Sequence, residues 1–422
     1  MKRRGRDLTT LEEPEVSGVA GSGMTAVFSY GLARHLVERH ASAVQIDWDA
    51  FDTQHRLGIV LKDRVPLLAE DAEVEANPPY RLWVKAASKG DDLRWLLANV
   101  PSPEHYDLLE VPLRWEFGDS PATRTRMRLT RGKIFYHRGP MIRRSEVSLK
   151  DIAVREPLPV RRLSQRDGEA MLVLARDTLA VRYRELHGFT WGDPRFVDEV
   201  DAGRGVRFYF SGVSPERRLP LRAYHAATIW KNGVPAGYFE GLSICERMEA
   251  GFNLFYTFRE GETAWLYSRL LQACHQLLGV TCFFLEPYQI GLENEEAIAS
   301  GAFWFYRKLG YRSVDEKLRE MTAREERKIA ALPGHRTPAA TLRKLVRCAM
   351  VYELPGTEQG VWDDFAVRNI GLASKRVPGI ERALRLKRLP EEITYLRHLQ
   401  QDRRLRRALL LNGLGGGRRS WS

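Results

Sequence analysis

A short loop between an aromatic run and a helical segment carries residues suited to binding a charged ligand. The loop reads Arg259-Glu260-Gly261-Glu262, and Thr263-Ala264 open the helical pattern that follows. The first turn of a helix leaves backbone N–H groups without partners and has a partial positive charge, so it can hold an anion. Two carboxylates at this place oppose that role, because two like charges about 4 Å apart repel by roughly 1–4 kcal/mol.

Three side chains can take part in proton transfer. They are Tyr306 in an aromatic helix, Glu240 on a predicted hairpin and Glu286 at the end of a predicted strand. A phenol or a carboxylate held close to a reacting atom can donate or accept a proton. Each also has a structural interpretation, since Tyr306 can pack with its neighbours 303–305 and the two glutamates can be structural. His225 has the same ambiguity, and a hydrogen-bonded histidine within a sheet is the interpretation that we favour.

The elements that must position these residues alternate between strand and helix from Phe252 to Tyr311. Apolar residues at helical spacing predict a helix over 263–278, and Gly279 stands where C-terminal glycines end helices. A continuous apolar run is typical of a strand buried on both faces. The predicted order is strand Phe252–Phe258, helix Thr263–Leu278, strand Val280–Leu285, a second helix ended by Gly310, and a strand from Tyr311.

A second group of elements precedes this unit, after a proline-containing linker at 154–160. We expect a strand at 160–163, a helix at 170–184 and a strand at 206–210. Asn232-Gly233 then separates two runs of strand composition. Both residues tolerate positive φ, so this pair predicts a tight β-hairpin.

The segment Ala302-Phe303-Trp304-Phe305-Tyr306-Arg307-Lys308-Leu309-Gly310-Tyr311 resembles the end of the GCN5-related N-acetyltransferase (GNAT) superfamily. In that family a helix typically closes as Phe-Tyr-x-Lys-Leu-Gly-Phe. The order of predicted elements over residues 157–316 is also similar to the family's. The resemblance implies an α/β (α+β) fold with a mixed sheet that splays near its centre, where acyl-coenzyme A (acetyl-CoA as the usual case) enters as co-substrate.

The resemblance also implies roles for the residues above. Tyr306 aligns with the tyrosine that protonates the leaving thiolate in many members, and Glu240 and Glu286 become candidates for the base that deprotonates an amine acceptor. The coenzyme's pyrophosphate would lie at the loop formed by Arg259, Gly261, Glu262, Thr263 and Ala264. The family loop reads Gln/Arg-x-x-Gly-x-Gly/Ala, so Arg259 and Ala264 match its outer positions. Glu262 stands where the family has glycine, and Gly261 is displaced by one position.

Three functions stay open on the sequence. The first is an N-acyltransferase acting on a small-molecule or peptide amine, and the second is the same fold as a non-catalytic binding or scaffold module. The third is aminoacyl transfer from a charged tRNA, motivated by the net charge of +12 and by arginines at 124–131 and 403–407 that could contact RNA or another polyanion. The positive charge is also spread along the chain, which is compatible with no specific partner.

Composition sets the domain organisation. The 422 residues suffice for two or three domains. We expect a disordered N-terminus at 1–23, a mainly helical region at 24–156, an acyltransferase-like domain at 157–318 and a charged helical extension at 319–422.

No membrane-spanning run or signal-type segment is present, so we expect a cytoplasmic protein. The four cysteines form no Cys-x-x-Cys pair, and the acidic stretch 47–52 lacks a calcium-loop pattern, so we expect no metal site and no disulfide.

Overall fold

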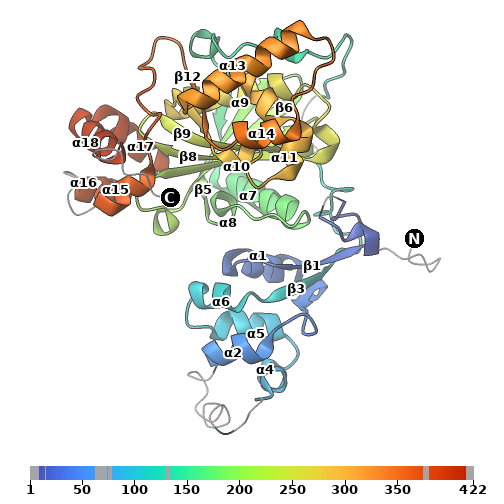
Figure 1. The fold of residues 1–422 in the computed structure, drawn as a ribbon. Helices are drawn as coiled ribbons and strands as arrows, with labels where there is room; N and C mark the ends of the chain where they lie inside the picture. The colour runs from blue at the N-terminus through green and yellow to red at the C-terminus, as the bar shows by residue number, and fades with distance from the viewer. Residues whose placement is uncertain are drawn as a thin grey trace. The chain divides into compact units, whose positions relative to one another are not determined.

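The computed structural model describes residues 9–14, 16–61, 74, 78–129, 134–373 and 380–414. The chain divides into two compact units, residues 1–130 with 169–191 and residues 131–168 with 192–422 (Figure 1). The sequence predicted boundaries after residues 23, 156 and 318, and placed 170–184 with the segments that follow it. Each unit is described by itself below.

The first unit is built around a small antiparallel sheet of order β1-β3-β2. Its strands are β1 (Gly23–Val27), β2 (Val44–Ile46) and β3 (Pro112–Glu116). Its helices are α1 (Tyr30–His40), α2 (Thr53–Leu61), α4 (Tyr80–Ser88), α5 (Asp92–Asn99), α6 (Pro103–Leu109), most of α7 (Gln165–Ala180) and α8 (His187–Thr190). Two of these helices, α5 and α6, begin with a polar N-cap residue. The side chain of Asp91 accepts a hydrogen bond from the backbone N–H of Arg94, and that of Ser102 accepts one from the backbone N–H of His105.

The N-terminal segment is anchored to the returning segment 169–191. The hydroxyl of Ser17 donates to the carbonyl of Val181 at 2.7 Å, and the side chain of Ser17 is fully buried. Gly18 follows with a φ of 83°, where an added Cβ would lie 2.8 Å from the carbonyl oxygen of Val181. Although the sequence predicted disorder over 1–23, residues 17 and 18 are therefore packed. Residues 1–8 lie outside the described part of the chain.

The second unit contains a nine-stranded mixed sheet of order β11-β12-β10-β9-β8-β7-β6-β5-β4. Neighbouring strands are antiparallel except for β9 and β10, which are parallel. The strands are β4 (Val160–Arg162), β5 (Gly192–Gly203), β6 (Val206–Val213), β7 (Ala223–Lys231), β8 (Val234–Ile244), β9 (Arg247–Leu254), β10 (Cys282–Leu285), β11 (Arg312–Ser313) and β12 (Met350–Glu353).

The helices of this unit follow β9 in the chain (Figure 1). Helix α9 connects the two parallel strands, which a parallel pair requires. It contacts α17 and β5, and α17 also contacts β6, β7 and β8. The helices are α9 (Thr263–Leu278), α10 (Pro287–Ile290), α11 (Glu295–Ser300), α12 (Ala302–Arg307), α13 (Glu316–Ala331), α14 (Ala339–Leu345), α15 (Val367–Ala373), α16 (Ile380–Leu386), α17 (Glu392–Gln401) and α18 (Arg403–Gly413).

Two local predictions are confirmed. Helix α9 spans 263–278, and Gly279 ends it with a φ of 68°. The hairpin β7–β8 turns at Asn232 and Gly233, with φ values of 50° and 76°. Positive φ at both turn positions matches the right-handed twist of the strands.

Two other predictions are wrong. The second helix of the 252–311 unit is not continuous, because Gly301 adopts a φ of 73° and separates α11 from α12. The region after residue 318 is not wholly helical, because β12 enters the sheet between β10 and β11. All four residues of β12 are buried, as expected for a strand with neighbours on both edges. No helix within the described ranges is long and apolar enough to cross a bilayer.

Candidate functional site

The parallel strands β9 and β10 pair over only part of their length. Arg247, Met248 and Glu249 pair with Cys282, Phe283 and Phe284 in turn. Residues 250–254 of β9 continue to pair with β8 on the other side but have no partner on β10. β10 itself ends at Leu285, so the edge of β9 toward β10 is unpaired beyond Glu249. We call this unpaired edge, from which the chain continues to α9, the opening between β9 and β10.

The residues predicted to hold a cofactor lie between the end of β9 and the start of α9. A one-turn 3₁₀ helix at Tyr256–Phe258 precedes them, and Glu262 occupies the N-cap position of α9. The backbone N–H groups of Thr263, Ala264 and Trp265 have no acceptor among the described residues. These free N–H groups lie at the N-terminal end of a 16-residue helix, and they are the feature that can bind an anion here.

Arg259 is held by its own neighbours. Its Nε donates to the carbonyl of Leu254 at 3.1 Å, and its guanidinium forms an ion pair with Glu296. Its backbone carbonyl accepts from the hydroxyl of Thr263 at 2.9 Å. Arg259 therefore fixes the loop geometry and remains exposed, while Glu260 and Gly261 are also exposed.

Glu262 is a structural anchor. Its carboxylate pairs with the Arg204 guanidinium, with Nε to Oε2 at 3.0 Å, and accepts from the backbone N–H of Ile142 at 2.9 Å. Burial acts to raise the pKa of Glu262, but the Arg204 contact and the Ile142 hydrogen bond outweigh it and leave the pKa below its ordinary value. The charge that the sequence placed against a bound anion is thus compensated by Arg204, a residue that sequence reasoning missed.

Tyr306 lies in a cluster of aromatic side chains between α9 and α12. Its ring is 5.5 Å from that of Tyr267, and the ring of Phe252, on the unpaired half of β9, is 5.0 Å from Tyr267. Burial raises the pKa of Tyr306, so the phenol stays protonated at neutral pH. Its hydroxyl has no hydrogen-bonding partner among the described residues, whereas the hydroxyls of Tyr267 and Tyr311 bond to each other at 2.6 Å.

The two candidate bases lie on strands that flank β9, Glu240 on β8 and Glu286 directly after β10. Glu240, on β8, accepts a hydrogen bond from the hydroxyl of Tyr224 at 2.6 Å and pairs with Gly251 of β9. Glu286 follows the last residue of β10 and is exposed. Although part of the residue faces solvent, partial desolvation of its carboxyl and the nearby charge of Glu249 raise the pKa of Glu286, which makes it a stronger base than an ordinary glutamate.

The other side chains considered in the sequence analysis are not part of this candidate site. His225 is buried within β7, and burial lowers its pKa to about 4, so it is neutral at physiological pH. Cys274 and Cys282 are free buried thiols whose pKa is raised by burial, so both stay protonated at neutral pH. Asp47 accepts hydrogen bonds from Thr25 and from the backbone of Ala50.

Residues able to hold a metal ion come together elsewhere, in the first unit. Among the described residues, one group of three has the ligand types and spacing that a metal ion needs, and it consists of His35, His40 and Asp177. The sequence did not single out any of them. No local signal could have joined them, because Asp177 lies 142 residues after His35.

Comparisons of the chain with protein-family models, with curated proteins and with solved structures find no match.

Proposed function

We propose that the second unit transfers an acyl group from an acyl thioester, such as acyl-coenzyme A, to an amine. The observation that carries this proposal is the parallel pair β9–β10, which has three paired positions and leaves the second half of β9 without a neighbour on that side, in the segment that leads to α9. An opening of this kind can admit an extended thioester between two strands, and free N–H groups at the start of α9 can bind its phosphates. The similarity of the 302–311 segment to acyltransferases supports the same function.

The proposed step is attack of the amine nitrogen on the thioester carbonyl. A C–N bond forms, the C–S bond breaks, and the departing thiolate takes a proton from the Tyr306 hydroxyl. Glu286 takes the proton that the amine loses. The raised pKa of Glu286 favours proton acceptance. The phenol of Tyr306 is protonated at neutral pH, although burial, which raises its pKa, makes it a weaker acid than an exposed tyrosine.

Calorimetric titration with acetyl-coenzyme A and with coenzyme A tests the binding half of the proposal. The diagnostic variant is Thr263→Pro, because residue 263 is the first residue of α9 and proline there removes an N–H. Glu262 has a ψ of 47° rather than the extended ψ that a residue before proline prefers, so circular dichroism must show that the variant is folded. Thr263→Ala retains that N–H and is the matched control. We expect Thr263→Pro to weaken binding about tenfold or more, as for loss of a hydrogen bond to a charged group, and Thr263→Ala to bind more tightly than Thr263→Pro. A well-folded protein that binds neither compound contradicts the proposal.

Release of free thiol in the presence of acetyl-coenzyme A and a panel of amines tests the chemistry. We expect Tyr306→Phe to lower turnover about 100-fold or more, the usual range for loss of a general acid, without loss of folding. Glu286→Gln is expected to lower turnover most below the pKa of the amine, where a base must take a proton from the acceptor. Above that pKa the amine is already neutral, so the effect should shrink. Unchanged turnover in Tyr306→Phe removes that residue from the mechanism.

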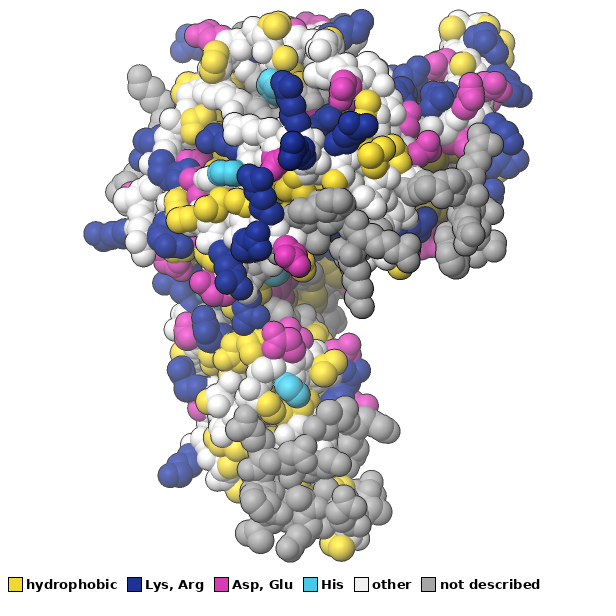
Figure 2. All heavy atoms as spheres, turned by 90° about the vertical axis from the view of Figure 1, so that its left-hand side faces the viewer, with side chains coloured by type: hydrophobic (Ala, Val, Ile, Leu, Met, Phe, Trp, Pro, Cys, Tyr) yellow, Lys and Arg dark blue, Asp and Glu magenta, His cyan; other side chains and the backbone are white. Residues whose placement is uncertain are grey.

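A basic surface supports aminoacyl transfer from tRNA as a second candidate function. Figure 2 looks onto the side of the second unit with the C-terminal helices and shows Lys and Arg side chains gathered there. The exposed arginines of α17 and α18 include Arg397, Arg403, Arg404 and Arg407. If they contact phosphates, RNA affinity falls steeply with salt, and each Arg→Ala change reduces the salt dependence by about one counterion. Absence of salt-sensitive RNA binding excludes this candidate.

A further inference from the structure

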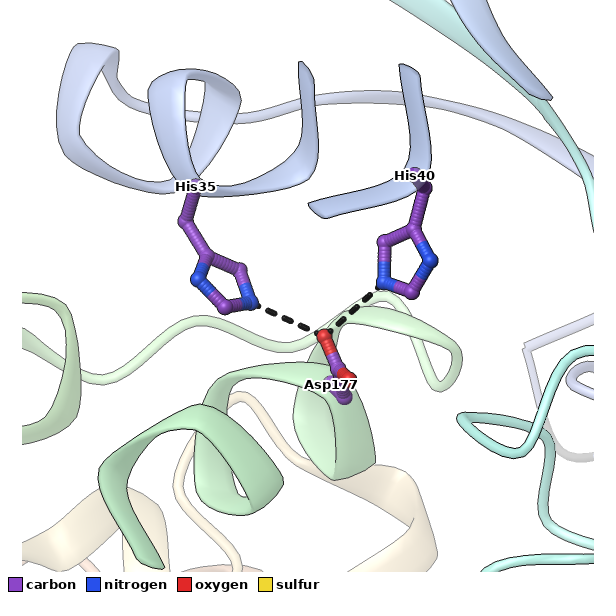
Figure 3. A group of neighbouring side chains, drawn as sticks. All are labelled: His35, His40 and Asp177. Atoms are coloured by element: carbon purple, nitrogen blue, oxygen red, sulfur yellow. Dashed lines mark hydrogen bonds and ion pairs between the residues drawn. The ribbon is translucent and has the colours of Figure 1, made fainter. Parts of the chain in front are cut away.

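His35, His40 and Asp177 form a compact group inside the first unit (Figure 3). His35 belongs to α1 and His40 is its last residue, while Asp177 lies on α7. The two imidazoles point from one helix toward the carboxylate on the other. The group belongs to neither the opening between β9 and β10 nor the loop at the start of α9.

The two histidines direct the same ring nitrogen at the same oxygen. Nε2 of His35 lies 2.9 Å from Oδ1 of Asp177, and Nε2 of His40 lies 3.1 Å from that oxygen. The three atoms all lie within 4.8 Å of one another. Ligands of a tetrahedral zinc ion, at bond lengths of about 2.0–2.2 Å, are separated by about 3.3 Å. Small side-chain rotations would therefore bring these three atoms to bonding distance around one ion.

The surroundings favour a bound cation over a purely hydrogen-bonded group. Asp177 is almost fully buried, and its other oxygen forms a long ion pair, at 3.9 Å, with Nε of Arg39, whose side chain is half exposed. Burying a carboxylate is costly unless an opposite charge compensates it. Neutral imidazoles supply hydrogen bonds but no charge. A divalent cation bound between the three side chains, where the hydrogen-bonded protons lie, would compensate the carboxylate charge.

Burial and ligand type indicate the kind of ion. The side chains of His35, His40 and Asp177 are 9%, 10% and 4% exposed, and the Trp115 ring packs 4.6 Å from that of His40. Two imidazoles and one carboxylate are ligands of zinc and of neighbouring first-row metals, whereas magnesium and calcium prefer oxygen ligands. Three protein ligands leave a position for water or substrate, as in catalytic rather than structural zinc sites.

We propose that His35, His40 and Asp177 bind a divalent transition-metal ion, with zinc as the best fit, at a site with one open coordination position.

The test uses the full-length protein, freed of metal with a chelator and then titrated with Zn²⁺. Bound metal is measured after equilibrium dialysis, and Co²⁺ is used as a spectroscopic probe because its visible absorption reports ligand type and coordination number. We expect one strongly bound Zn²⁺ per chain, a Co²⁺ spectrum of four- or five-coordinate geometry, and a metal-dependent rise in the melting temperature.

Three variants decide whether the ion lies on these residues. Asp177→Asn retains an oxygen that accepts hydrogen bonds but removes the charge, and His35→Ala removes a ligand. His105, exposed on α6 of the same unit, provides His105→Ala as the matched control. Changing a group that only supports a metal ligand costs about 10–100-fold in affinity, so we expect both ligand variants to lose at least that much and the control to lose none.

Two results overturn the proposal. One is the absence of stoichiometric Zn²⁺ and Co²⁺ binding by the folded protein. The other is equal affinity in the parent and in Asp177→Asn, with circular dichroism showing that both are folded. Either result leaves the group as two histidines hydrogen-bonded to one carboxylate.

Discussion

The buried ion pair between Lys387 and Glu392 joins the C-terminal helices to the large sheet. Glu392, the first residue of α17, accepts from Nζ of Lys387 at 2.7 Å and from the backbone N–H groups of Val213 and Tyr224 at 3.0 and 3.2 Å. Nζ of Lys387 also donates to the carbonyl of Arg222 at 2.8 Å. Both side chains are less than 9% exposed. One carboxylate thus satisfies donors from β6, β7 and the C-terminal region.

Glu392→Ala should therefore be severely destabilising. Removing one partner from a buried ion pair costs about 3–5 kcal/mol. The backbone N–H groups of Val213 and Tyr224 also lose their acceptor, at about 1 kcal/mol or more each. We expect a loss of about 5 kcal/mol in the free energy of unfolding, which is comparable to the whole stability of many domains.

Urea unfolding followed by circular dichroism measures this effect. With a urea dependence of roughly 2–3 kcal/mol per molar, the transition of the second unit should move down by about 2 M. Glu391→Ala is the matched control, because the neighbouring Glu391 pairs with Arg162 at the surface, at 2.6 Å. Such exposed pairs contribute at most about 1 kcal/mol.

The double variant Lys387→Met with Glu392→Gln separates charge from hydrogen bonding. The neutral glutamine retains an oxygen for the backbone N–H groups, and methionine removes the unpaired cation. We expect this variant to be more stable than Glu392→Ala, since replacing a buried pair by neutral groups is often close to neutral. If Glu392→Ala shifts the midpoint no more than Glu391→Ala does, the pair does not anchor the C-terminal region and the reasoning is refuted.

Three further predictions concern single positions. Burial lowers the pKa of His225 from 6.5 to about 4, so stability should decline by up to roughly 3 kcal/mol as pH falls from 6.5 to 4, and His225→Gln should flatten that part of the pH dependence of the urea midpoint; an unchanged slope would contradict it. The pKa of Glu262 is held low by Arg204, so Glu262→Gln should lower the melting temperature above pH 5, and the difference from the parent should vanish as acid protonates the carboxylate. Gly233→Ala should cost about 1 kcal/mol, because alanine is strained at a φ of 76°, and the urea midpoint measures it, with Val234→Ala on the exposed start of β8 as control.

Local patterns explain which elements the sequence could predict. Helix α9 repeats apolar residues at helical spacing and ends at a glycine, and the turn at 232–233 has residues that tolerate positive φ. Such signals lie within a few positions of the elements that they specify. By contrast, β12 is only four residues long and lies among charged helices. Its strand conformation depends on β10 and β11, which precede it by many residues.

The candidate site shows the same distinction. Tyr306 and the loop 259–264 could be selected from sequence because both belong to short motifs. The compensation of Glu262 could not, because Arg204 lies 58 residues earlier and meets it only in the folded unit. The group of His35, His40 and Asp177 was missed for the same reason. Contacts between distant segments carry no local pattern, so the structure was needed to find them.

The position of β12 between β10 and β11 also has a consequence for synthesis of the chain. When β10 leaves the ribosome, the strand that will cover its edge has not yet been made, because β10 ends at Leu285 and β12 begins at Met350. At about 5–20 residues per second, this interval lasts roughly 3–13 s. During that time one edge of β10 has no partner and can pair with other nascent chains. The last quarter of the protein therefore closes the sheet, and chains truncated before residue 350 are expected to aggregate.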